Sequence, residues 1–171
     1  MRLGKTYFPR FRWCVLPVIF TLIVIGPAIA NAQTFLFSGG GGTINLQIET
    51  ATAGSEPNSA TDNFTELSWD ADYGVTSKVT VTTTCPSQNF SLFVELTVTT
   101  YGTGSVGTEQ GEIELINGML DTDMLRDIPL LSPGRVGSGT LTYRAVATVS
   151  DGNSNENGDD VHTVTYTLTA Q

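Results

Sequence analysis

Apolar and polar residues alternate with a period of two along most of the chain after the first 32 residues, and this pattern constrains the fold more than any other. Ile44, Leu46 and Ile48 alternate with polar residues, and the apolar residues of 92–98 and 141–149 are spaced in the same way. A period of two places every second side chain on one face of a β-strand, whereas a helix needs spacings of three and four. The sequence therefore predicts an all-β protein whose strands each place one face on a core.

Further alternating segments, separated by clusters of Gly, Asn, Asp, Ser and Pro, bring the expected number of strands to about eight. They are Thr34 to Phe37, Thr65 to Trp69, Val79 to Val81, Ile113 to Leu115 and Val164 to Leu168. Short strands without helical segments between them favour an antiparallel β-sandwich of immunoglobulin-like type. Residues 33–171 are expected to form one such domain, because their number suits a single core and no repeat or linker is visible.

Three long connections separate these strands. Residues 51–63 and 151–160 are polar, so we expect both to be solvated loops. Residues 117–137 are rich in Leu and Met but contain two prolines. That segment is too apolar for a free loop, and we expect an irregular or single-turn helical cover over an open end of the sandwich.

The first 32 residues predict that the chain is exported. Four basic residues precede an apolar stretch at 15–25, and Ala30-Asn31-Ala32 is a small-x-small cleavage site before Gln33. A retained membrane anchor is the alternative, but two prolines and a glycine interrupt the apolar run. We therefore interpret 1–32 as a signal peptide of bacterial type. The mature protein is expected to be secreted, periplasmic or on the cell surface, and free of the membrane.

The charge of residues 33–171 excludes several classes of partner. Four of the eight basic residues lie in 1–32, which leaves four against 17 acidic residues and a net charge of −13. Binding to nucleic acid or to anionic lipid requires clustered Lys or Arg, so neither partner is expected. The acidity is typical of a soluble extracellular protein, or alternatively of one that works in high salt.

Residues with catalytic potential are scarce in the mature chain. Cys85 and His162 are each the single residue of their type after Gln33, so no internal disulfide and no Cys/His metal cluster are expected. We expect Cys85 to fill apolar space and His162 to be an ordinary histidine at a strand end. The paired carboxylates, Glu112 with Glu114 and Asp70 with Asp72, are expected to be solvated charges. The sequence predicts a protein that is not an enzyme and has no cofactor.

One polar loop has the oxygen-rich composition of a calcium site. Oxygen-bearing side chains occur there at every second position, and Ca²⁺ binds several oxygens on a flexible loop. These residues are Asp151, Asn153, Asn155, Asn157 and Asp159. The spacing differs from that of a standard twelve-residue calcium loop, because Glu156 stands at the place of the turn glycine. Calcium at this loop and a plain hairpin loop without metal are the two alternatives.

The short N-terminal strand is a candidate interaction element. Phe35 and Phe37 lie at alternate positions and need to be buried against something, and residues 38–42 form a Gly-rich flexible spacer. The strand can fold back on its own sandwich and leave the protein a monomer. Alternatively it can add to the open edge of a neighbouring copy, which would give a head-to-tail chain.

In outline the chain is similar to fimbrial subunits, which are exported Thr-rich and Gly-rich β-sandwiches with alternating terminal strands. It lacks the paired cysteines common in those subunits and has Ala170 where they have a penultimate Tyr, so no membership is assigned. The absence of catalytic motifs and the exchangeable strand favour a structural or interaction component of the cell surface or of an extracellular appendage.

A carbohydrate-binding module is the alternative function. It would use Trp69, Tyr73 and Tyr101 as stacking platforms for sugar rings, with nearby carboxylates accepting hydrogen bonds from sugar hydroxyls. Trp69 shares its parity with Leu67, which instead suggests a place in the core. If these aromatic residues line one exposed face, the carbohydrate-binding function is favoured over the structural one.

Overall fold

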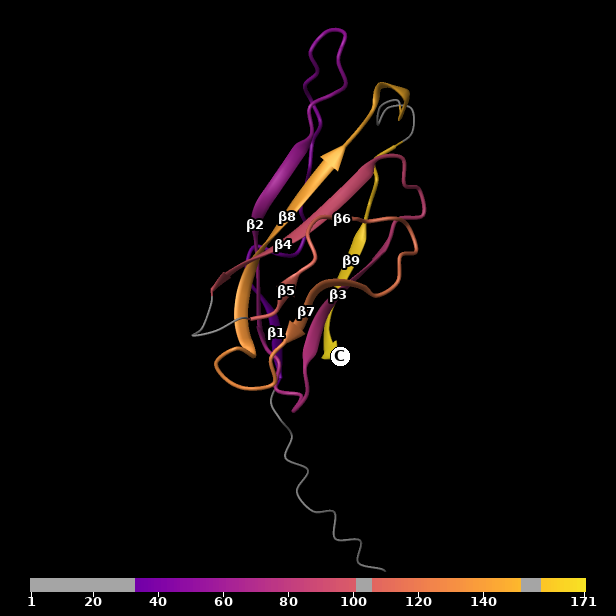
Figure 1. Ribbon diagram of the computed structural model, residues 1–171. Helices are drawn as coiled ribbons and strands as arrows, with labels where there is room; N and C mark the ends of the chain where they lie inside the picture. Colours follow the sequence, from indigo (N-terminus) through magenta and orange to yellow (C-terminus); the bar gives the residue numbers. More distant parts are fainter. Residues whose placement is uncertain (1–32, 101–105, 152–157) are drawn as a thin grey trace, which may run out of the picture. The chain divides into compact units, whose positions relative to one another are not determined.

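The computed structural model describes residues 33–100, 106–151 and 158–171 (Figure 1), and within them the protein is all-β, as predicted. It has nine strands there rather than about eight. They are β1 (Thr34–Gly39), β2 (Ala60–Asp70), β3 (Ser77–Thr84), β4 (Ser91–Thr100), β5 (Thr108–Glu109), β6 (Ile113–Glu114), β7 (Thr122–Ile128), β8 (Val136–Val146) and β9 (Thr163–Ala170). A single 3₁₀ turn, Val149–Asp151, follows β8.

The strands form two antiparallel sheets. One has the order β1-β2-β8-β4-β6 and the other the order β5-β7-β3-β9, and every recorded pairing is antiparallel. Figure 1 shows the three long strands β2, β8 and β4 lying next to one another in the first sheet. The predicted antiparallel β-sandwich is confirmed.

The core lies between the sheets, and most of it comes from apolar residues at alternate positions of the long strands. Leu67 and Trp69 of β2 are buried together with Val79 and Val81 of β3. β8 lies close to the Trp69 ring at Gly137. A Cβ atom added to this glycine would lie only 2.5 Å from Trp69 Cζ2, too close for any other residue without a shift. Glycine at that position therefore allows the largest core side chain to lie against the backbone of the neighbouring strand.

Residues 117–137 differ from the expected irregular or helical cover. They contain β7, which pairs with β3 on one side and β5 on the other, and Met124, Leu125 and Ile128 of β7 are buried. The pairing of β7 with β3 is interrupted by two register shifts, and Asp127 has a positive φ of 56°. These irregularities break the two-residue period, which is why the sequence pattern did not reveal a strand.

Residues 44–48 were expected to form a strand and do not. They belong to no strand, although Ile44, Leu46 and Ile48 are half-buried and the residues between them are exposed. Ile44 and Leu46 pack against the core cluster. The alternation therefore predicted correctly which side chains face the protein, but the backbone of this segment pairs with no strand among the described residues.

The four cations of the described residues are all in ion pairs. The Lys78 Nζ lies 2.7 Å from Asp123, which Arg126 also contacts at 3.3 Å. Arg135 and Arg144 pair with other carboxylates, as described below. The excess of acidic groups is therefore uncompensated over the rest of the described surface. No helix among the described residues has the length and apolar character that crossing a bilayer requires.

Candidate functional site

The N-terminal strand β1 folds back on its own sandwich. It pairs antiparallel with β2, with Phe35 opposite Trp69 and Phe37 opposite Leu67. Both partners are core residues, so the two phenylalanines lie on the inner face of the sheet and extend the core toward its edge. Phe35 is half-buried and packs against the core, whereas Phe37 keeps 48% of its surface exposed.

An open pocket lies between β1 of one sheet and β9 of the other. Its volume is about 260 Å³, and its lining includes Phe35, Phe37, Leu67 and Tyr166. The rings of Phe37 and Tyr166 meet edge to face with their centroids 6.2 Å apart, which is a favourable aromatic arrangement. The two edge strands thus meet across this side of the sandwich through aromatic side chains.

A glycine turn joins β1 to the rest of the chain. Gly40, Gly41 and Gly42 all have positive φ angles, between 61° and 80°, a conformation that other residues adopt only with strain. On its other side β1 pairs with no strand among the described residues. β1 is thus an edge strand that is attached to the sandwich by one ladder and one glycine turn.

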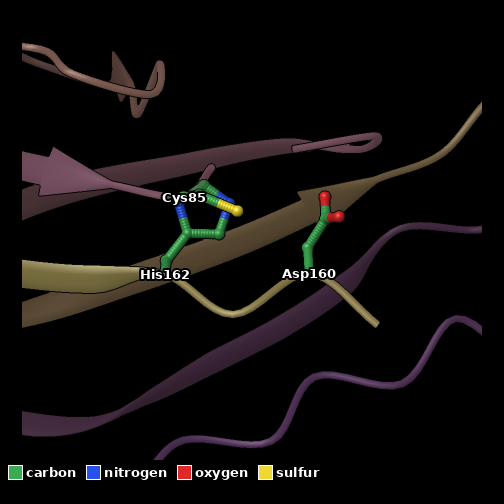
Figure 2. A group of neighbouring side chains, drawn as sticks. All are labelled: Cys85, Asp160 and His162. Atoms are coloured by element: carbon green, nitrogen blue, oxygen red, sulfur yellow. The ribbon is translucent and has the colours of Figure 1, made fainter. Parts of the chain in front are cut away.

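A second group of side chains gathers where β3 ends and β9 begins. Figure 2 shows Cys85, Asp160 and His162 side by side at this end of the second sheet. Thr84, the last residue of β3, pairs with Thr163, the first residue of β9. The antiparallel ladder therefore places the residue after Thr84 and the residue before Thr163 next to each other.

The three side chains lie close enough together to bind one ion. One sulfur, nitrogen or oxygen atom from each lies within 4.8 Å of the corresponding atoms of the other two. Cys85 is 1% exposed, and the other two side chains are half-buried. The Nε2 atom of His162 is buried and has no hydrogen-bond partner, while its Nδ1 lies 3.4 Å from Thr83 Oγ1.

The Asp160 carboxylate is held in place by the loop that follows Cys85. The backbone N–H groups of Asn89 and Phe90 donate hydrogen bonds to it at 2.8 and 2.7 Å, and the Asn89 side-chain amide donates another at 3.2 Å. Asn117 Oδ1 accepts a hydrogen bond of 2.8 Å from the Cys85 backbone N–H. The backbone around the cluster is therefore fixed by side-chain hydrogen bonds from two connections.

Burial is the largest influence on the pKa values of Cys85 and His162. It raises the pKa of the Cys85 thiol, and the negative charge of Asp160 raises it further. It also lowers the pKa of His162, an effect that Asp160 partly opposes. At neutral pH the cluster therefore holds a protonated thiol and a neutral imidazole. A buried, protonated thiol is a weak nucleophile, so the arrangement does not favour thiol catalysis.

Sequence reasoning did not predict this cluster, because it counted only Cys and His as soft metal ligands and left out the carboxylate of Asp160. The signal that could have found it is the pairing of the two Thr-rich strands at 80–84 and 163–169. Aligning those strands antiparallel brings Cys85 and His162 to the same end of the sheet.

The predicted calcium loop lies largely outside the described residues, since Asn153, Asn155 and Asn157 fall within 152–157. Of its two other residues, Asp159 is exposed. Asp151 accepts a hydrogen bond of 2.6 Å from the Thr148 N–H. The calcium site stays a prediction.

Three of the four paired carboxylates are engaged in ion pairs. Arg144 pairs with Glu112 at 2.6 Å, while Glu114 accepts a hydrogen bond of 3.0 Å from Ser91. Asp70 and Asp72 both pair with Arg135, at 2.9 and 2.6 Å. Three of the four carboxylates are thus paired with arginines and the fourth with a serine hydroxyl, rather than being simply solvated charges.

The aromatic residues of the carbohydrate-binding alternative do not share one exposed face in the described structure. Trp69 is 2% exposed and belongs to the core, and the Tyr73 hydroxyl donates a hydrogen bond of 2.6 Å to the Leu168 carbonyl. Tyr101 lies outside the described residues. Trp69 therefore cannot stack on a sugar ring in this fold.

Comparisons of the chain with models of known families, with characterised proteins and with solved structures gave no match.

Proposed function

We propose that this protein is an exported, non-enzymatic β-sandwich that serves as a structural or interaction component of the cell surface or of an extracellular appendage. In this proposal copies of the chain associate by exchanging the N-terminal strand β1. The observation that carries the proposal is the placement of β1 at a sheet edge, joined to the sandwich by one ladder and one glycine turn.

Exchange would conserve the contacts of β1. If β1 of one copy leaves its own β2 and pairs with β2 of the next, Phe35 still lies opposite a Trp69 and Phe37 still meets a Tyr166. The free-energy difference between the closed and the exchanged states then depends mainly on the association entropy and on the glycine turn. Because each copy donates one strand and accepts one, the contact is head-to-tail and extends into a chain.

A disulfide trap tests strand exchange. Leu36 of β1 and Ser68 of β2 are register partners, and antiparallel partners lie within reach of a disulfide bond. We expect the Leu36→Cys/Ser68→Cys variant to form covalent dimers and longer chains when oxidised at high protein concentration. The measurement is a non-reducing gel with intact mass, on the full chain purified after export with Cys14→Ser present throughout.

The matched control places the trap where no exchange is proposed. Ser68 and Ser138 are register partners in the pairing of β2 with β8, so Ser68→Cys/Ser138→Cys should give only an intrachain bond at every concentration. If the Leu36→Cys/Ser68→Cys variant also gives only the intrachain bond, β1 is an internal strand and assembly through it is refuted.

Export is tested separately from assembly. The Ala30-Asn31-Ala32 site predicts that exported protein begins at Gln33, and N-terminal sequencing of that material measures it. Recovery of the chain in a membrane fraction with Met1 still present would contradict export by a cleaved signal peptide.

A further inference from the structure

We propose that Cys85, Asp160 and His162 form a binding site for one transition-metal ion of the zinc class. The proposal is independent of strand exchange, because the cluster lies at the junction of β3 and β9 and includes no residue of β1.

The three side chains supply the ligand types that zinc takes in proteins. Zinc binds a cysteine sulfur, an imidazole nitrogen and a carboxylate oxygen, and calcium and magnesium prefer oxygen ligands alone. In a tetrahedral zinc site neighbouring ligand atoms are roughly 3.3–3.6 Å apart, given the usual metal–ligand bond lengths. The three atoms here lie within 4.8 Å of one another, which exceeds that spacing by about 1 Å.

The environment of His162 supports the assignment. When the Nδ1–H of a metal-binding histidine donates a hydrogen bond, the lone pair of Nε2 is left free for the metal. Thr83 Oγ1 lies 3.4 Å from Nδ1 and can accept such a bond, while Nε2 is buried and has no hydrogen-bond partner. A buried nitrogen without a partner is unfavourable, and a metal ion would satisfy it.

The other two ligands are held in place before any ion binds. The backbone N–H groups of Asn89 and Phe90 orient the Asp160 carboxylate, and the hydrogen bond from the Cys85 backbone to Asn117 fixes the position of the sulfur-bearing residue. Hydrogen bonds of this kind around a ligand carboxylate are usual in metal sites. Three protein ligands leave the fourth tetrahedral position for water or for a small external ligand.

Cobalt titration tests the site directly, because Co²⁺ replaces Zn²⁺ in tetrahedral sites and its bond to a thiolate absorbs in the near ultraviolet. The sample is the exported protein stripped of metal. Cys14→Ser is present so that Cys85 is the single thiol even in any chain that keeps residues 1–32. We expect a near-ultraviolet band that saturates at one equivalent of Co²⁺ and disappears when Zn²⁺ is added.

Single substitutions then identify the ligands. Cys85→Ser should remove the near-ultraviolet band, and His162→Gln and Asp160→Asn should each weaken Co²⁺ binding at least tenfold. Asp159→Asn is the matched control, since it removes the same charge from an exposed neighbour outside the cluster, and it should leave the affinity unchanged. Far-ultraviolet circular dichroism and melting curves establish that each variant is folded.

Two results would overturn the proposal. One is a folded protein that shows no band at millimolar Co²⁺. The other is a band whose midpoint is the same in His162→Gln and in Asp160→Asn as in the parent, which would mean that the thiol alone binds the ion. If Cys85→Ser does not fold, the half-buried His162 and Asp160 still decide the question, because their variants retain the thiol.

Discussion

Two tyrosine hydroxyls join the two sheets of the sandwich. The hydroxyl of Tyr143 on β8 lies 2.6 Å from that of Tyr166 on β9. Burial is the main cause that raises the pKa of each tyrosine; the mutual hydrogen bond lowers the pKa of Tyr143 and raises that of Tyr166. Both side chains therefore stay neutral in the folded protein at pH values where a free tyrosine begins to ionise.

These raised pKa values predict a loss of stability in alkali. An unfolded chain loses its tyrosine protons near pH 10 while the folded protein keeps them, so the contribution of the pair is complete below about pH 10 and falls above it. The loss amounts to about 1.4 kcal/mol per pH unit for each tyrosine that is ionised in the unfolded chain and still protonated in the folded protein. Urea unfolding at pH 8 to 11 measures it.

The double variant Tyr143→Phe/Tyr166→Phe provides the comparison. It should lose much less stability between pH 9 and pH 11 than the parent, since the two raised tyrosine pKa values are absent from it. Each single variant should be less stable than the parent at pH 7 by about 1 kcal/mol, because it leaves one buried hydroxyl without its partner. Identical alkaline slopes in the parent and the double variant would contradict this account.

At the scale of elements, β1 and β7 differ both in their place in the sheet and in how clearly the sequence predicts them. β1 is an edge strand whose alternation is regular and visible in the sequence. β7 lies inside its sheet between β5 and β3, and its pairing with β3 has register shifts that hide the alternation. Both contribute apolar side chains to one core. Regular alternation in the sequence therefore does not indicate whether a strand lies at the edge or in the interior of its sheet.

The inward side chains of β1 should matter more for stability than its outward one. Phe35 packs against the core, whereas Leu36 is 50% exposed on the opposite face of the same strand. We expect Phe35→Ala to lower the free energy of unfolding by about 2 kcal/mol, less than for a fully buried phenylalanine. Leu36→Ala, the matched control, should cost less than about 1 kcal/mol. Chemical denaturation of both variants measures the difference.

Equal losses in the two variants would mean that β1 does not add to the core. Deleting 33–42 should in turn lower the melting temperature of the monomer. If the melting temperature and the sedimentation are both unchanged after that deletion, β1 neither stabilises the sandwich nor mediates assembly.

At the scale of the whole molecule, charge is the dominant surface property. After residue 32 the chain has 17 acidic residues against four basic ones, and each of those four cations is in an ion pair. The remaining carboxylates repel one another, and this repulsion destabilises the folded state.

Salt is therefore expected to stabilise the protein. Raising NaCl from 0.01 to 0.1 M shortens the Debye length from about 30 to about 10 Å, which screens repulsion among distant surface charges. The melting temperature should rise over this range. It should rise less in Glu49→Gln/Glu66→Gln, which removes two exposed carboxylates. A melting temperature that falls with salt would mean that the ion pairs outweigh the repulsion.

Several features were determined by the sequence alone. The two-residue period predicted an all-β sandwich, and the shared parity of Leu67 and Trp69 placed both in the core, where the structure has them. These features are predictable because they follow from local side-chain spacing, which any β-strand converts into an inner and an outer face. The fold-back of β1, in contrast, was not determined by the sequence, which allowed exchange with a neighbouring copy as well.

The remaining features were decided by tertiary structure. Residues 44–48 have the alternation of a strand but no partner, and β7 has partners but little alternation, because hydrogen-bonded pairing is a property of two segments and not of one. The Cys85, Asp160 and His162 cluster exists because β3 and β9, about 80 residues apart in the chain, pair in one particular register. A shift of that register by one residue would turn β9 side chains to the other face of the sheet and separate the three groups.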